Sequence, residues 1–163
     1  MGLDMYLTAK VYFYEYDNRK EIEDAIEQIK SMSSSLSLPA SWKPKTIVFE
    51  VMYWRKANAI HNWFVKNVQG GKDDCHEYEV CSSDLKKLLD DINNILNEDS
   101  NAKQEEFINN LLPPRPGFFF GSTDIDEYYF EVLKYTKKEL EKLLQLYDTK
   151  PNCIWWFEYH SSW

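Results

Sequence analysis

The sequence predicts an α+β fold, in which a mainly antiparallel sheet of about four to five strands packs with four to five helices in a single domain. Stretches with apolar residues at every second position, typical of strands, alternate with stretches of helical periodicity. One long strand at the start and a short one at the end favour antiparallel pairing. The 163 residues, 44% of them hydrophobic, suffice for one buried core.

The first predicted strand, residues 4–16, alternates without interruption. Its inward face carries Met5, Leu7, Ala9, Val11 and Phe13. A helix follows, because the apolar residues from Ile22 to Ile29 recur at helical spacing, and Asn18 with Glu21 fits a capping box. The segment 31–45 is rich in serine and proline, so we expect a mobile loop or lid there.

The remaining elements continue this alternation. The β-branched and aromatic content of Thr46 to Trp54 predicts a buried strand. After it we expect a helix from about Trp54 to Gln69, a strand from His76 to Cys81, a helix capped by Ser82 or Ser83, a short helix around Phe107 to Leu112, an apolar strand at Phe118 to Gly121, a helix ending near Tyr147 and a strand from Cys153 to His160. The last helix begins at one of two capping boxes, Asp124 with Glu127 or Thr136 with Glu139.

Charge and composition exclude several classes of protein. The net charge of −8, from 19 basic and 27 acidic residues, argues against non-specific nucleic-acid binding and against docking on an anionic membrane. Three cysteines indicate a reducing compartment, and we find no signal peptide and no apolar run of membrane-spanning length. We therefore expect a cytoplasmic protein.

Residues 51–72 contain no Asp or Glu but four basic residues. Arg55 and Lys56 fall at the predicted start of a helix, where free N–H groups and the helix dipole favour anions. Trp54 adds a flat face for a nucleobase or sugar. The window therefore predicts an anion site with an aromatic wall.

On a helical wheel, Trp54, Asn58 and His61 line one border between the core and solvent, beside a polar stripe that includes Asn62. Amide, imidazole and aromatic groups on one border can recognise a polar ring. The alternative for each residue alone is that Trp54 and His61 belong to the boundary of the core and that the cations are merely solvated.

A second acid-free window, residues 107–123, adds two candidates. Arg115 lies between prolines, which restrict its backbone and preorganise its guanidinium for binding. Ser122 follows Gly121 and offers a hydroxyl to an anion, although a helix cap is the simpler interpretation. We find no catalytic motif and no metal site, since Cys75, His76 and Cys81 lack zinc-ligand spacing. No cofactor is expected.

Several motifs spread over the chain resemble a family of small uncharacterised proteins of bacterial and phage genomes. The motifs are MGLDMYL, YWRKANAIHNWFV at Tyr53 to Val65, LLP followed by GFFFGSTD at Gly117 to Asp124, DEYYF at Asp126 to Phe130, and EYHSSW at the end. The resemblance implies a cytoplasmic protein of phage or mobile-element origin in a bacterial host, and it implies no mechanism.

These observations predict a non-enzymatic protein that sequesters a small anionic, nucleotide-like ligand, such as a phage-encoded sponge for a nucleotide signal of bacterial immunity. The 26 aromatic residues leave spare apolar surface, which predicts a homo-oligomer. One alternative is a phosphoesterase or nucleotide hydrolase, with His61 as general acid or base and Arg55 and Arg115 stabilising charge. Another is an inhibitor that acts through protein–protein contacts.

Overall fold

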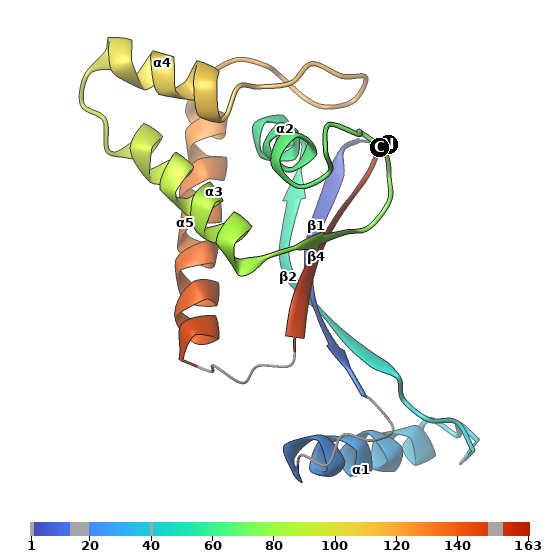
Figure 1. Cartoon of the computed structure of the whole chain (residues 1–163). Coiled ribbons are helices and arrows are strands. Elements are labelled where there is room, and N and C mark those ends of the chain that lie inside the picture. Colours follow the sequence, from blue (N-terminus) through green and yellow to red (C-terminus); the bar gives the residue numbers. More distant parts are fainter. Residues whose placement is uncertain (1, 14–19, 40, 150–154) are drawn as a thin grey trace.

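Four antiparallel strands form one sheet at the centre of the molecule (Figure 1). This computed structural model describes residues 2–13, 20–39, 41–149 and 155–163. The strands are β1 (Asp4–Tyr12), β2 (Thr46–Arg55), β3 (Tyr78–Val80) and β4 (Trp155–Ser162), and their order across the sheet is β2-β1-β4-β3. The two terminal strands therefore pair at its centre, and β2 forms one edge. The α+β class with an antiparallel sheet is confirmed.

Five helices accompany the sheet in the described part of the chain. They are α1 (Lys20–Ser35), α2 (Asn58–Asn67), α3 (Ser82–Leu96), α4 (Asn101–Leu111) and α5 (Glu127–Asp148). Figure 1 shows α2, α3 and α5 beside one face of the sheet, whereas α1 lies apart, beyond the far ends of β1 and β2. None of the described helices combines the length and the apolar character needed to cross a membrane.

The core fills the space between the sheet and its covering helices. Met5, Leu7 and Ala9 of β1 are at most 2% exposed, which confirms the first part of the predicted inward face, whereas Val11 and Phe13 are only half-buried. The rings of Phe64 and Tyr159 stack with centroids 4.0 Å apart, which packs α2 directly against β4. This stack positions α2 over the sheet.

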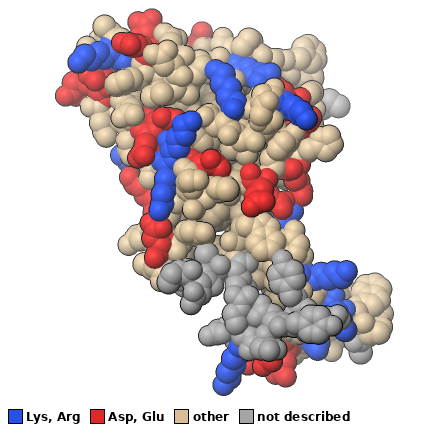
Figure 2. Space-filling view, viewed as in Figure 1, with Lys and Arg blue, Asp and Glu red and all other residues tan. Residues whose placement is uncertain are grey.

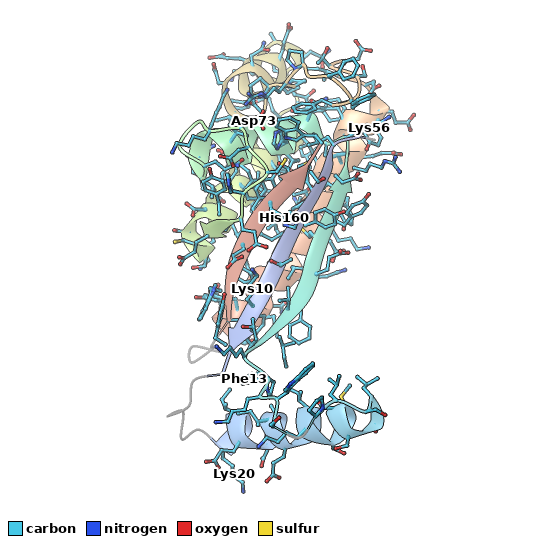
Figure 3. The ribbon with its side chains drawn as sticks, turned by 90° about the vertical axis from the view of Figure 1, so that its right-hand side faces the viewer. Lys10, Phe13, Lys20, Lys56, Asp73 and His160 are labelled. Carbon is cyan, nitrogen blue, oxygen red and sulfur yellow. The ribbon has the colours of Figure 1, made fainter. Side chains whose placement is uncertain are left out.

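No helix of the described residues covers the opposite face of the sheet, and side chains on this face pair with one another (Figure 3). Tyr6 stacks on His160 at 4.8 Å. Lys10 forms ion pairs with Glu158 and, at 2.8 Å, with Glu77. On the face drawn in Figure 2, acidic and basic side chains are interspersed, so the net negative charge is not concentrated there.

The segment 31–45 differs from its prediction in its first part. Helix α1 continues to Ser35, so the serines at its end are helical. The hydroxyls of Ser33 and Ser34 donate to the carbonyls of Ile29 and Lys30, one turn earlier, at 2.8 and 3.2 Å. These bonds satisfy the hydroxyls within the helix. Among the described residues, 36–45 contain no helix or strand, and the mobility of the segment stays a prediction.

The predicted strand at Thr46 to Trp54 is confirmed as β2, but the prediction that it is buried is wrong for most of its length. Met52 and Trp54 are buried, but Val48 and Phe49 are 52% and 54% exposed. Because β2 is an edge strand whose first half extends away from α2 and α5, these apolar side chains have little covering them (Figure 1).

The predicted strand at Phe118 to Gly121 is a turn in the structure. Phe119 has a positive φ of 72°, and the Phe120 N–H donates to the Gly117 carbonyl at 3.2 Å. The Phe120 ring folds back so closely over Gly117 that a Cβ there would lie 2.5 Å from it. The turn therefore requires glycine at position 117. The strand prediction is wrong because it treats the three phenylalanines as one buried run, whereas only Phe120 among them is buried.

Helix starts also differ from the predicted caps. Cys81, not Ser82 or Ser83, is the N-cap of α3, and its N–H donates to Asp84 at 2.9 Å. Asp126 caps α5 by accepting from the Tyr129 N–H at 3.0 Å, so neither predicted capping box begins this helix. Asn18 and Cys153 lie outside the described residues.

We predict that Leu88→Ala lowers the free energy of unfolding by about 2–5 kcal/mol, because Leu88 is fully buried in the core. Leu146→Ala is the matched helical control, since Leu146 is 43% exposed, and should change stability by less than ~0.5 kcal/mol. Urea unfolding of both variants measures the difference. Equal losses would contradict the described core.

Candidate functional site

The junction between β2 and α2 places two basic side chains. Pairing with β1 continues through Arg55, which lies opposite Asp4, and the Lys56 N–H then donates to the Leu3 carbonyl at 2.7 Å. Lys56 has a φ of 56°, and α2 begins only at Asn58. The prediction that Arg55 and Lys56 form the first turn of the helix is therefore wrong, because the sheet holds the chain extended to this point.

The left-handed backbone of Lys56 brings both cations to one place. Successive side chains of a regular strand point to opposite faces. Here a Cβ on Gly2 would lie 3.6 Å from Lys56 Cε and 3.9 Å from Nε and Nη2 of Arg55. Asp4 is 3.9 Å from the guanidinium, and the Arg55 side chain remains 61% exposed. The pair thus converges on Gly2 and keeps access to solvent.

A groove of about 280 Å³ adjoins Arg55. It is lined by Tyr53, Trp54, Arg55, Ala57, Tyr128, Glu131, Val132 and Tyr135. The three tyrosines are 38 to 50% exposed, so their rings are available to a ligand. The Tyr128 hydroxyl donates to the Arg55 carbonyl at 2.6 Å, which ties the first turn of α5 to the end of β2. The groove therefore has aromatic walls, and this hydrogen bond holds α5 and β2 together along one side of it.

A smaller hollow of about 30 Å³ adjoins this groove at Ala57, Tyr128 and Val132. Its lining includes Lys56 and the start of α2, a helix with no acidic residue in its first turn and no side-chain cap. Two acids also line it, but both are engaged. Asp126 caps α5, and Asp124 accepts from the Ser122 hydroxyl at 2.7 Å.

Asn58 and Asn62 fasten the loop at residues 113–122 to α2. The Asn58 amide nitrogen donates to the carbonyls of Phe120 and Ser122 at 3.2 and 2.7 Å, and its oxygen accepts from the Arg115 N–H at 3.2 Å. The Asn62 amide donates to the Pro113 carbonyl at 3.0 Å. Both side chains are buried, so these polar groups organise the loop that borders the small hollow.

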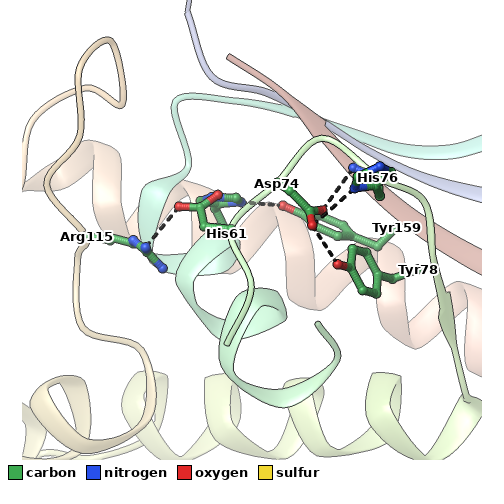
Figure 4. Close-up of polar contacts among 7 residues, drawn as sticks. His61, Asp74, His76, Tyr78, Arg115 and Tyr159 are labelled. Carbon is green, nitrogen blue, oxygen red and sulfur yellow. Dashed lines mark hydrogen bonds and ion pairs between the residues drawn. The ribbon is translucent and has the colours of Figure 1, made fainter. Parts of the chain in front are cut away.

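A chain of four polar side chains runs inward from the same loop (Figure 4). Arg115 pairs with Asp73 at 3.0 Å, and Asp73 contacts Nε2 of His61 at 3.1 Å. Nδ1 of His61 lies 2.8 Å from the Tyr159 hydroxyl. Burial lowers the pKa of His61 below its ordinary value of 6.5, and this effect exceeds the opposite effect of the Asp73 carboxylate. His61 is therefore a buried, neutral base with both ring nitrogens occupied.

The structure separates seven of the eight predicted site residues into two groups, and Trp54 belongs to neither. Arg55 and Lys56 reach solvent beside the groove, and Ser122 lines the small hollow. Asn58, His61, Asn62 and Arg115 meet in the internal network at α2. Trp54 is 3% exposed and donates to the Thr136 hydroxyl at 2.9 Å. The predicted border of Trp54, Asn58 and His61 does not exist as a helical stripe, because Trp54 belongs to β2.

Sequence reasoning missed the aromatic walls of the groove. Tyr128 and Tyr135 are seven positions apart in α5, and Glu131 lies between them at helical spacing. This spacing was a readable signal of one stripe on the helix. The sequence could not assign Tyr53 to the groove, because its place in the wall depends on β2 being an edge strand beside α5.

Comparison of the chain with protein-family models, with curated proteins and with solved structures finds no match. Within the described ranges, no group of three or more His, Cys, Asp or Glu side chains is placed to hold a metal ion.

We predict that Asn58→Ala lowers the free energy of unfolding by about 1–3 kcal/mol, because it leaves the buried Phe120 carbonyl and the partly buried Ser122 carbonyl without this donor. Asn67→Ala, which removes a local bond to the Trp63 carbonyl and an exposed bond from Lys87 at the end of α2, is the control and should cost less. Urea unfolding compares the two, and limited proteolysis should show faster cleavage near 113–122 in Asn58→Ala alone. Identical behaviour would show that Asn58 does not fasten the loop.

The lowered pKa of His61 gives stability a defined pH dependence. The unfolded chain binds a proton near pH 6.5, whereas folded His61 binds it only at lower pH, so stability should fall as the pH drops below about 6.5. Urea unfolding between pH 5.5 and 7.5 should show a shallower slope for His61→Gln than for wild type. His76→Gln is the control, because that side chain is 81% exposed. An NMR titration giving His61 a pKa above 6.5 would contradict the assignment.

Proposed function

We propose that this protein binds a small nucleotide-like ligand in the groove between the end of β2 and α5, without converting it. One observation carries the proposal: Arg55 and Lys56 converge on Gly2 beside a groove whose walls are three partly exposed tyrosines. Cations that share one point favour an anionic group, and exposed rings favour a planar one.

The lining fits the two ends of such a ligand. Arg55, with five N–H donors, would take a phosphate next to Lys56, and the tyrosine rings would stack on a base. Glu131, on the same stripe of α5, would accept hydrogen bonds from amino or hydroxyl groups. A simple inorganic anion would leave Glu131 and the aromatic walls unused, so a ligand with both an anion and a ring is favoured.

The hydrolase alternative has less support. His61 is fully buried, both its ring nitrogens are engaged, and it lines neither the groove nor the small hollow. A general acid or base must come within hydrogen-bond reach of the reacting group. Binding without turnover needs no such residue.

The test is calorimetry with a panel of mononucleotides and cyclic dinucleotides. Arg55→Ala should weaken binding of the best ligand roughly 10- to 100-fold, the loss of one charge-assisted hydrogen bond, with little change in stability. Lys66→Ala, an exposed cation in the same acid-free window but outside the groove, is the control and should bind like wild type.

Two outcomes would contradict the proposal. If no member of the panel binds, or if Arg55→Ala and Lys66→Ala behave alike, the groove is not the site. If mass spectrometry recovers the nucleotide hydrolysed rather than intact, the protein is an enzyme and the alternative is favoured.

A further inference from the structure

One edge of the sheet is formed by β2. β2 pairs with β1 on one side, and no described residue pairs with it on the other. A register irregularity in its pairing with β1, at Leu7/Thr8 of β1, divides β2 into two halves. In the half that ends at Arg55, Tyr128 covers part of the edge by donating to the Arg55 carbonyl. In the first half of the strand, residues 46–50, which we call the lower half, the edge has no such contact among the described residues.

The backbone of the lower half presents Val48 to this edge. The Phe13 N–H donates to the Lys45 carbonyl at 2.9 Å, so Lys45 directs its backbone polar groups toward β1. These groups alternate in direction along an antiparallel strand. Ile47 and Phe49 therefore also face β1, whereas the N–H and C=O groups of Thr46, Val48 and Glu50 point outward.

Residues 46–49 of the lower half lack the devices that normally keep strand edges apart, and its one charged residue, Glu50, lies at the end of the stretch. Proteins protect edges with lysine, proline or a bulge within the exposed stretch, or by covering it. Residues 46–49 read TIVF, with no charge and no proline, and Val48 and Phe49 are more than half exposed. An uncharged, apolar edge of this kind is a template for pairing with another strand.

We propose that the edge of β2 at residues 46–50 pairs antiparallel with the same edge of a second copy of this chain, with the two-fold axis at Val48. This register places Val48 opposite Val48 of the partner subunit and Ile47 opposite Phe49 of the partner subunit. It continues the sheet from four strands to eight and sets the apolar side chains that the single chain exposes beside those of the partner subunit. The proposal does not depend on ligand binding in the groove.

Charge favours the antiparallel orientation of a second copy. Antiparallel pairing about Val48 sets the exposed Glu50 opposite the uncharged Thr46 of the partner subunit, so the two glutamates lie at opposite ends of the paired stretch. A parallel pair in register would instead bring the two glutamates together, which is unfavourable.

The register makes a position-specific prediction for crosslinking. With Cys75, Cys81 and Cys153 replaced by serine, Val48→Cys should form a disulfide-linked dimer under mild oxidation, because residues opposite each other in a hydrogen-bonded pair have Cα atoms about 5.5 Å apart. Thr46→Cys is the control on the same edge and the same face. Its two copies would be separated by about 13 Å along the strands, so it should stay uncrosslinked.

Sedimentation of the full chain tests the interface without crosslinking. Wild type should sediment as a dimer, and Val48→Lys, which places two like charges on the axis, should sediment as a folded monomer. Leu146→Lys, on the exposed side of α5, should remain dimeric. A wild-type monomer at all concentrations, a dimer that survives Val48→Lys, or equal crosslinking of Val48→Cys and Thr46→Cys would overturn the proposal.

Discussion

The left-handed backbone of Lys56 is the constraint on which the candidate site depends. It ends the pairing of β2 with β1, turns the chain into α2 and directs two neighbouring cations to one side. A side chain in this region of φ and ψ is uncommon and costs free energy, so the surroundings must hold it there. They do so with the bond from the Lys56 N–H to Leu3 and with the close approach of Gly121, where a Cβ would lie 3.0 Å from Lys56 Cβ.

Buried polar groups organise the interior of the molecule beside the candidate site, between α2, the loop at 113–122 and β4. Asn58 and Asn62 bond the loop at 113–122, and the chain from Arg115 through Asp73 to His61 connects that loop with Tyr159 of β4. Buried polar groups that find partners specify one arrangement, because any other leaves them unpaired. These residues therefore act on the site indirectly, by fixing the loop beside the small hollow.

The sequence predicted the fold class and the face of β1 because both rest on periodicity, a local property. It failed where the outcome depends on distant contacts. Local sequence predicts Arg55 and Lys56 in a helix, because nothing local marks this point as the end of a strand. The apolar run at Phe118 predicts a strand, because its folding back over Gly117 is a tertiary contact. The absence of acids around Arg55 and Lys56 is visible in the sequence and predicts the basic pair. Tyr53 and Tyr128 line one groove only because β2 is an edge strand that lies beside α5.

The central claim is that the protein holds an anionic, ring-bearing molecule between Arg55, Lys56 and the tyrosines. Mass spectrometry of the small molecules released on denaturing freshly purified protein tests it most directly, with the double variant Arg55→Ala, Lys56→Ala purified in parallel. We expect wild type to release an intact phosphate-bearing molecule with an aromatic ring, and the double variant to release little of it. Release of the same molecule in equal amounts from both proteins, or of none from wild type, would contradict the claim.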